Sequence, residues 1–141
     1  MTKHILFVCT GNICRSPFAE YYGRSLWSDH DIVTSSAGTW AMVGQQATEN
    51  MIALGSEHGL DLSPHRAQPL GSAKSPDLIL GMEQHHVDAA TEAFPELPDG
   101  AVRLLVPTGV GDPYGRPMDA YERSVDIIIR GIEATDLNDL R

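Results

Sequence analysis

Short apolar runs alternate along this chain with segments whose apolar residues recur at helical spacing. The run HILFVC, from His4 to Cys9, is rich in strand-forming residues and lacks polar alternation, as in strands buried on both faces. Comparable runs cover Ile32–Ser36, Asp77–Met82 and Ala101–Pro107. We therefore predict four buried strands.

Helices are predicted at four places between and after these strands. The first covers Pro17–Ser28 after an N-cap at Ser16, with Glu20 in a first turn that favours negative charge. The third covers Glu83–Phe94, and the fourth begins near Asp119. The apolar stripes that predict the first, second and fourth helices are Ala19, Tyr22 and Leu26; Ala47, Met51, Leu54 and His58; and Tyr121, Val125, Ile128, Ile129 and Ile132.

This alternation predicts an α/β fold: one domain over residues 1–141, with a four-stranded parallel sheet and helices on both faces. A chain of 141 residues is long enough to bury a core without disulfide or metal staples. In such sheets, ligands bind beyond the carboxyl ends of the strands. The unusual segments Cys9–Pro17 and Gly109–Pro117 both follow strands, so we expect them to meet at one edge.

Composition narrows the function classes. The net charge of −9 argues against a broad nucleic-acid or anionic-membrane surface, although a local anion site stays possible. The chain has no apolar run near the ~20 residues that span a bilayer, and we predict no signal peptide. Its two cysteines are too few for a disulfide framework, so a cytoplasmic location is expected.

The segment VCTGNICRSP (Val8–Pro17) joins a buried strand to a helix and carries the candidate chemistry. A loop of this size can point successive backbone N–H groups at one anion, which the helix N-terminus also attracts. Arg15 can donate a fork of two hydrogen bonds to such an anion, while Gly11 and Asn12 tolerate left-handed backbone. The same surroundings would favour a thiolate at Cys9. The candidate phosphate-binding residues are Thr10, Gly11, Asn12, Ile13, Cys14, Arg15 and Ser16.

Other interpretations of this segment are weaker. An ordinary strand–turn–helix with a buried cysteine is the plain alternative. Cys9 and Cys14 lack zinc-knuckle spacing, and the adjacent His85 and His86 are expected to point in different directions on a helix, so no metal site is predicted. A nucleotide-binding P-loop is disfavoured because G-x4-G-K-[ST] does not occur.

The pattern C-x5-R-S after a buried strand resembles the protein tyrosine phosphatase signature. In detail the chain resembles the low-molecular-weight tyrosine phosphatase family, through VCTGNICRSP, SSAGT (Ser35–Thr39), HRAQPL and DPYG (Asp112–Gly115), in that order. The resemblance implies a phosphotyrosine phosphatase I-like sheet and a two-step mechanism without metal or cofactor. It also implies a phosphorylated protein or peptide as substrate and inorganic phosphate as product; no oligomeric state is indicated.

Carried over by position, the resemblance makes Cys9 the nucleophile that forms a cysteinyl-phosphate and Arg15 the clamp on the phosphate oxygens. Asn12 and Ser16 order the loop, and Asp112 is the general acid. The residues support the last role independently. A phenolate leaving group, with a pKa near 10, benefits from a proton in the transition state, and the following Pro113 holds Asp112 extended.

Several further residues have two interpretations. Trp40, Tyr114 and Ile13 are expected at the substrate rim, although Trp40 and Tyr114 could be ordinary loop aromatics. Cys14 either offers only its amide to phosphate or, as the family implies, traps oxidised Cys9 as a reversible disulfide. His65 and Arg66 are expected to anchor a loop.

The resemblance leaves more than one activity open. An apolar residue at position 13, here Ile13, goes with tyrosine phosphatases in the family, whereas threonine goes with protein-arginine phosphatases, which are the runner-up. Arsenate reduction is disfavoured because no cysteine follows Cys14. A non-catalytic phosphate-binding module would be expected to lose Cys9 or Asp112, and both are present.

Overall fold

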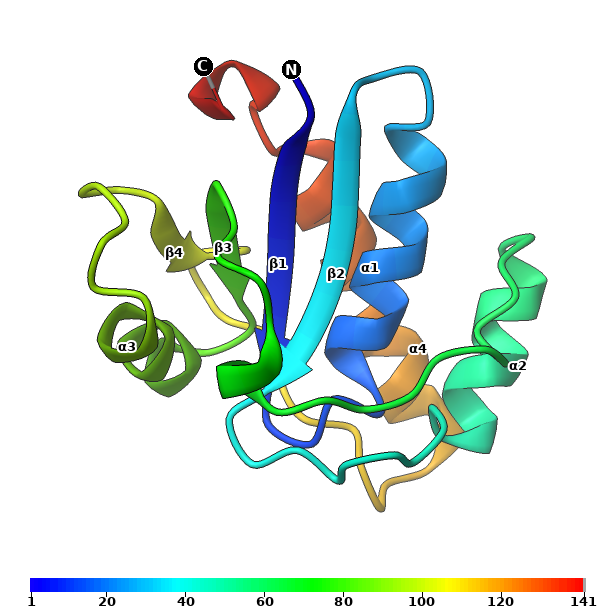
Figure 1. Ribbon diagram of the computed structural model, residues 1–141. Coiled ribbons are helices and arrows are strands. Elements are labelled where there is room, and N and C mark those ends of the chain that lie inside the picture. The colour runs from blue at the N-terminus through cyan, green and yellow to red at the C-terminus, as the bar shows by residue number, and fades with distance from the viewer. Residues whose placement is uncertain (141) are drawn as a thin grey trace.

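The computed structural model describes residues 1–140, which form a four-stranded parallel sheet with the strand order β2-β1-β3-β4 (Figure 1). The strands are β1 (Lys3–Cys9), β2 (Ile32–Gly38), β3 (Leu78–Gly81) and β4 (Val102–Leu104). The four strands predicted from apolar runs are thus confirmed. Strand β4 is shorter than predicted, because its pairing partner β3 ends at Gly81, opposite Leu104.

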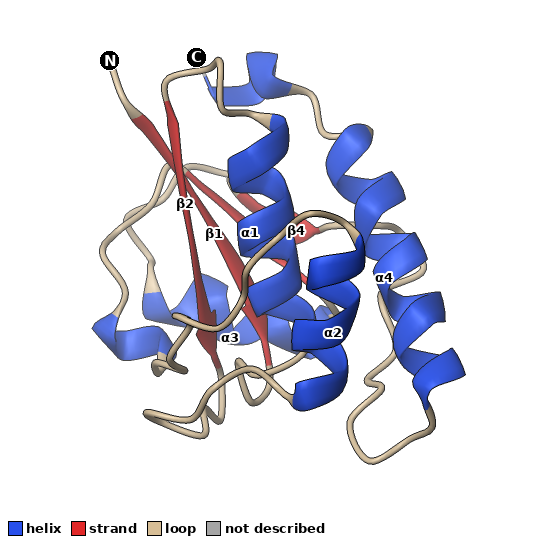
Figure 2. Cartoon of the chain, turned by 90° about the vertical axis from the view of Figure 1, so that its right-hand side faces the viewer, coloured by secondary structure: helices blue, strands red, loops and turns tan. Residues whose placement is uncertain are grey.

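Helices cover both faces of this sheet, as predicted (Figures 1 and 2). Helices α1 (Arg15–Leu26), α2 (Glu49–Glu57) and α4 (Met118–Glu133) lie on one face, and α3 (Gln84–Ala93) lies on the other. Two short 3₁₀ helices, η1 (Leu70–Ser72) and η2 (Leu137–Leu140), complete the described elements. No helix in residues 1–140 combines the length and the apolar character needed to cross a membrane.

Strand β1 is buried from both sides because its side chains alternate between two cores. Ile5 and Phe7 pack into the larger core with α1, α2 and α4, while Leu6 and Val8 pack into the smaller core with α3. This explains the unbroken apolar run. The predicted stripe of α4 is buried at Tyr121, Val125, Ile128 and Ile132, and Ile129 is half-buried.

Helix α1 departs from its predicted start and face. It begins at Arg15, with Cys14 in the N-cap position, whereas Ser16 was predicted as the cap. The Ser16 hydroxyl instead contacts Cys9 Sγ, at the end of β1, at 2.9 Å. Leu26 is 44% exposed, and Glu20 is buried beyond the first turn.

The predicted stripe of α2 is only half right. Met51 and Leu54 are buried within the helix, but Ala47 precedes it and His58 caps its carboxyl end. His58 is exposed and lies edge-on to the ring of Phe18.

The two loops singled out in the sequence meet at one edge of the sheet. Cys9 ends β1, and Arg15 begins α1 directly after the loop. The Arg15 guanidinium donates a 2.7 Å hydrogen bond to the carbonyl of Val110, which lies in the segment after β4. The parallel arrangement therefore brings residues far apart in the sequence together at the carboxyl ends of the strands.

Replacing Gly38 by alanine is expected to destabilise the protein by about 1–3 kcal/mol, because the added methyl group would overpack this edge of the sheet. A Cβ at Gly38 would collide with the carbonyl oxygen of Thr10 and lie 3.1 Å from Ala41 Cα. Urea denaturation gives the free energy of unfolding. Gly71→Ala is the matched control, because a Cβ there meets nothing within 4 Å. Equal stability of the two variants would contradict this packing argument.

Candidate active site

The loop between β1 and α1 is held in an unusual backbone conformation at Asn12, whose φ is +59°. Three hydrogen bonds fix this residue. Its side-chain amide donates to Ser16 Oγ at 2.8 Å, its Oδ1 accepts from the Gln68 N–H at 2.9 Å, and its carbonyl accepts from His65 Nε2 at 2.7 Å. These three hydrogen bonds allow a non-glycine residue to remain in the left-handed region of backbone conformation.

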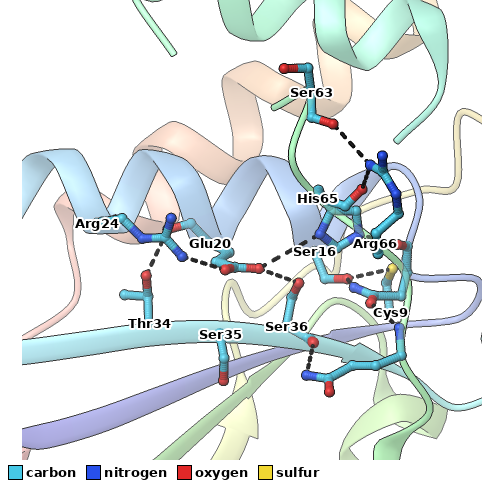
Figure 3. A network of polar contacts seen from close by, with 12 residues as sticks. Cys9, Ser16, Glu20, Arg24, Thr34, Ser35, Ser36, Ser63, His65 and Arg66 are labelled. Carbon is cyan, nitrogen blue, oxygen red and sulfur yellow. Dashed lines mark hydrogen bonds and ion pairs between the residues drawn. The ribbon is translucent and has the colours of Figure 1, made fainter. Parts of the chain in front are cut away.

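The same network reaches the sulfur of Cys9 (Figure 3). Ser16 Oγ accepts a hydrogen bond from Asn12, so its own hydrogen is available for Cys9 Sγ, 2.9 Å away. Both Asn12 and Ser16 are fully buried. A hydroxyl that donates to sulfur stabilises a thiolate, which is the nucleophilic form of cysteine.

A buried carboxylate supports the loop from helix α1. Glu20 Oε1 accepts a 2.6 Å hydrogen bond from Ser36 Oγ and lies 3.9 Å from His65 Nδ1, while its other oxygen pairs with Arg24 (Figure 3). Burial raises the pKa of Glu20 and lowers the pKa of His65. His65 thus anchors the loop as predicted, whereas Glu20 was missed, because nothing local in the sequence places it under His65.

Arg66 lies beside this network but outside the pocket of the loop. It is exposed, and its Nη1 donates to the carbonyl oxygens of Ser63 and His65. These bonds fix the path of the segment that carries His65. Arg66 therefore supports the loop of Asn12 indirectly, through His65.

Arg15 is a buried cation whose two terminal nitrogens face protein partners. Its side chain is 1% exposed, and its Nη1 pairs with Glu83 Oε1 at 2.6 Å and donates to the Val110 carbonyl at 2.7 Å. Its Nη2 lies 3.5 Å from Thr10 Oγ1 and 3.7 Å from Asp112 Oδ2. The buried Nε has no hydrogen-bond partner among the described residues. Buried guanidinium donors normally find acceptors, so the site is suited to an oxyanion.

Asp112 faces this guanidinium from the opposite loop. Its Oδ1 accepts a hydrogen bond from the backbone N–H of Tyr114 at 3.1 Å, and its side chain is 49% exposed. The carboxyl group is therefore oriented by the DPYG turn while solvent can still reach it. This geometry suits a group that gives and takes protons.

A pocket of about 360 Å³ lies next to the loop between β1 and α1, and residues predicted for the site line it. Trp40 and Tyr114 are 82% and 55% exposed at its mouth, whereas Ile13 is buried in its wall. Met42 also lines the pocket and was missed, although the apolar run from Trp40 to Val43 was a signal for it. The lining comprises Cys9, Thr10, Gly11, Ile13, Cys14, Arg15, Trp40, Met42, Asp112 and Tyr114.

Cys14 differs in its surroundings from Cys9, and both are free cysteines. Its sulfur lies 3.8 Å from Thr48 Oγ1 and 3.9 Å from Tyr121 Oη. Burial raises the pKa of the Cys14 thiol to about 11, against the opposing effect of these two hydrogen bonds. Cys14 is therefore a neutral thiol at physiological pH, and a reversible disulfide with Cys9 stays a prediction.

One group of metal-ligand side chains occurs among the described residues. Ligand atoms of Glu83, His85 and His86 lie within 4.8 Å of one another. The ring centroids of His85 and His86 are 4.1 Å apart, so the prediction that the two side chains point in different directions is wrong. The reason is that His86 turns back toward the helix N-terminus to cap it. Glu83 and His86 already have protein partners, namely Arg15 for the carboxylate and Thr10 for the imidazole.

The model of the low molecular weight phosphotyrosine protein phosphatase family matches residues 4–135. The chain belongs to this family. Among curated members, Wzb of Escherichia coli (strain K12), a low molecular weight protein-tyrosine-phosphatase, is 41% identical over 128 residues, covering 86% of this chain and 84% of that protein. The family resemblance inferred from the sequence motifs is thus confirmed.

Solved structures of the phosphatase family have the same fold. Wzb from Escherichia coli K30, in complex with sulphate, superposes with a TM-score of 0.83 at 31% identity, covering 94% of this chain and 95% of that chain. The YwlE arginine phosphatase from Geobacillus stearothermophilus superposes with a TM-score of 0.79 at 29% identity, covering 93% and 88%. The predicted fold class is confirmed.

The two cysteines are expected to differ in alkylation. At pH 7, iodoacetamide should modify Cys9 in the Cys14→Ser variant and leave Cys14 unmodified in the Cys9→Ser variant. The reason is that a thiol with a pKa of about 11 is protonated at every pH well below that value, and only the thiolate reacts. Intact-mass spectrometry over time measures both rates. Comparable modification of the two cysteines would contradict the assignment.

Proposed function

We propose that this chain is a protein tyrosine phosphatase that hydrolyses phosphotyrosine in proteins or peptides through a cysteinyl-phosphate. One observation carries the proposal: the buried Arg15 guanidinium, whose Nε has no partner in the described part of the chain, shares a pocket with Cys9 and Asp112. A tetrahedral phosphate offers the acceptors that the guanidinium lacks. Membership of the phosphatase family supports the same reaction.

In the first step, the Cys9 thiolate attacks phosphorus, and the bond from phosphorus to the phenolic oxygen breaks. Asp112 gives its proton to the departing oxygen, which would otherwise leave as a phenolate. Arg15 and the backbone N–H groups of the Thr10–Ser16 loop bind the remaining phosphate oxygens. Because these donors are already oriented by the fold, they stabilise the transition state without reorganisation.

In the second step, water attacks the cysteinyl-phosphate. The Asp112 carboxylate takes a proton from that water, and the sulfur–phosphorus bond breaks to restore the Cys9 thiolate. The Ser16 hydroxyl, 2.9 Å from the sulfur, stabilises the thiolate as a leaving group. The products are inorganic phosphate and the dephosphorylated substrate, and all the groups that act are side chains or amides of this chain.

The walls of the pocket favour an aromatic substrate. Trp40 and Tyr114 stand at its mouth, and Ile13 and Met42 add apolar surface beside them. A phenyl ring between such side chains would bury apolar area and stack on the aromatic rings. Phosphoarginine is the second candidate, because an arginine phosphatase is among the structural neighbours.

A general acid at Asp112 is tested by changing the leaving group. Asp112→Asn should lower kcat/KM, which reports the transfer of the phosphoryl group to Cys9, by ~10²–10⁴-fold on phenyl phosphate, yet far less on 2,4-dinitrophenyl phosphate, whose leaving group needs no proton. Inorganic phosphate should bind with unchanged affinity. Steady-state kinetics with both substrates, with EDTA present throughout, make the comparison. An equal loss on both substrates would exclude proton donation by Asp112.

Cys9→Ser removes the proposed nucleophile and should abolish turnover of both substrates. If Cys9→Ser retained activity, or if EDTA removed the activity of the unaltered protein, the proposed mechanism would be wrong.

Substrate choice is expected to depend on Ile13, which is only 7% exposed in the pocket wall. The unaltered protein should have a higher kcat/KM on a phosphotyrosine peptide than on the same peptide with phosphoarginine. Ile13→Thr should shift this ratio toward phosphoarginine by about tenfold, because it removes apolar contact with the phenyl ring. Ile13→Val is the matched apolar control. A preference for phosphoarginine in the unaltered protein would establish the second candidate instead.

A further inference from the structure

His86 is a buried histidine whose two ring nitrogens are both engaged next to the active-site loop. The side chain is 0% exposed and projects from the first turn of α3. Its Nδ1 accepts a 3.0 Å hydrogen bond from the backbone N–H of Glu83. Its Nε2 lies 2.8 Å from Oγ1 of Thr10, the loop residue directly after Cys9.

These contacts decide which nitrogen carries the proton. A backbone N–H can only donate, so Nδ1 must be unprotonated, and the proton of the neutral ring is on Nε2. Nε2 therefore donates to the Thr10 hydroxyl oxygen. That oxygen also faces the Nη2 of Arg15, at 3.5 Å.

The charges around His86 favour the neutral ring. Burial lowers its pKa to about 4, and the positive charges of Arg15 and His85 act in the same direction. Glu83 and Asp112 oppose them with a smaller effect. Protonation at Nδ1 would also break the hydrogen bond from the Glu83 N–H, which caps α3.

We propose that His86, as the neutral Nε2–H tautomer, is a positioning residue that orients the Arg15 guanidinium for phosphate by holding Thr10 and Glu83 together. The proposal rests on the proposed function, because the oriented group is the phosphate-binding arginine. His86 does not itself line the substrate pocket, and it contacts that lining through the Thr10 hydroxyl. It acts through Glu83 and Thr10, which contact the two terminal nitrogens of the Arg15 guanidinium.

The geometry of Arg15 explains why both contacts matter. Glu83 Oε1 holds Nη1 at 2.6 Å, and Thr10 Oγ1 faces Nη2. A guanidinium is planar and rigid, so fixing both terminal nitrogens also fixes the direction of Nε–H. That Nε is a buried donor without a hydrogen-bond partner in residues 1–140. His86 binds the backbone of Glu83 and the side chain of Thr10, and so sets the distance between the two supports.

The first test compares phosphate binding in five variants. Calorimetric titration with inorganic phosphate should show that His86→Gln and Thr10→Val each weaken binding by about tenfold, the usual cost of one lost hydrogen bond. The double variant should bind no more weakly than the weaker single variant, because either change already breaks the His86–Thr10 hydrogen bond. Thr10→Ser keeps the hydroxyl and should bind as the unaltered protein does. His85→Gln changes the exposed neighbouring histidine and is the matched control.

Unchanged phosphate affinity in His86→Gln, or fully additive losses in the double variant, would overturn the proposal. Because phosphate binding needs no turnover, this readout stands even if the protein fails to hydrolyse phosphotyrosine. A general loss of stability is distinguished by the Thr10→Ser rescue, which a merely structural role would not require.

The second test uses the unaltered protein and does not depend on any variant folding. In ¹⁵N-detected nuclear magnetic resonance, the His86 ring should show the Nε2–H tautomer and no titration between about pH 5 and pH 8, the range in which an ordinary histidine titrates. An Nδ1–H tautomer, or a midpoint near an ordinary histidine value, would contradict the proposed hydrogen bonds. So would displacement of the Nε2 proton by added Zn²⁺, which would assign His86 to a metal site.

Discussion

Burying the guanidinium of Arg15 obliges distant parts of the fold to supply acceptors, because an unpaired buried cation costs several kcal/mol. Glu83 supplies a carboxylate from the segment between β3 and α3, and Val110 supplies a carbonyl from the segment after β4. Both segments follow strands on the same side of β1 in the sheet. The strand order therefore determines which loops can neutralise this charge, and the charge in turn fixes those loops around Cys9.

The opposite side of the Cys9 loop is supported by a different kind of contact. There Asn12 is held by neutral hydrogen bonds to Ser16, His65 and Gln68. Glu20 lies next to His65 (Figure 3). The loop is thus clamped between an ionic support on the β3 side and a polar network on the β2 side. Rigidity at this position matters chemically, because donors that are already oriented stabilise a developing charge without a reorganisation cost.

Sequence analysis succeeded where the signal was local. Buried parallel strands produce unbroken apolar runs, and the spacing from Cys9 to Arg15 reflects a single loop that needs no distant residue to be recognised. It failed where one side chain had two possible partners. Ser16 was predicted to cap α1 but contacts Cys9, and His86 was expected to point away from His85 but caps α3. Glu83 and Glu20 could not be assigned because their importance follows from the path of the chain in three dimensions.

The separation of the Arg15 partners along the chain has a consequence for synthesis. Val110 is 95 positions after Arg15, and Glu83 is 68 positions after it. The ribosome must release most of the chain before either contact can form, since closing such long loops precedes the contacts that stabilise them. A growing chain that displays only β1, α1 and β2 carries Cys9 and Arg15 without Glu83 and Val110, the partners that fix the guanidinium. The guanidinium beside Cys9 therefore gains its fixed orientation only when the segments after β3 and β4 are in place.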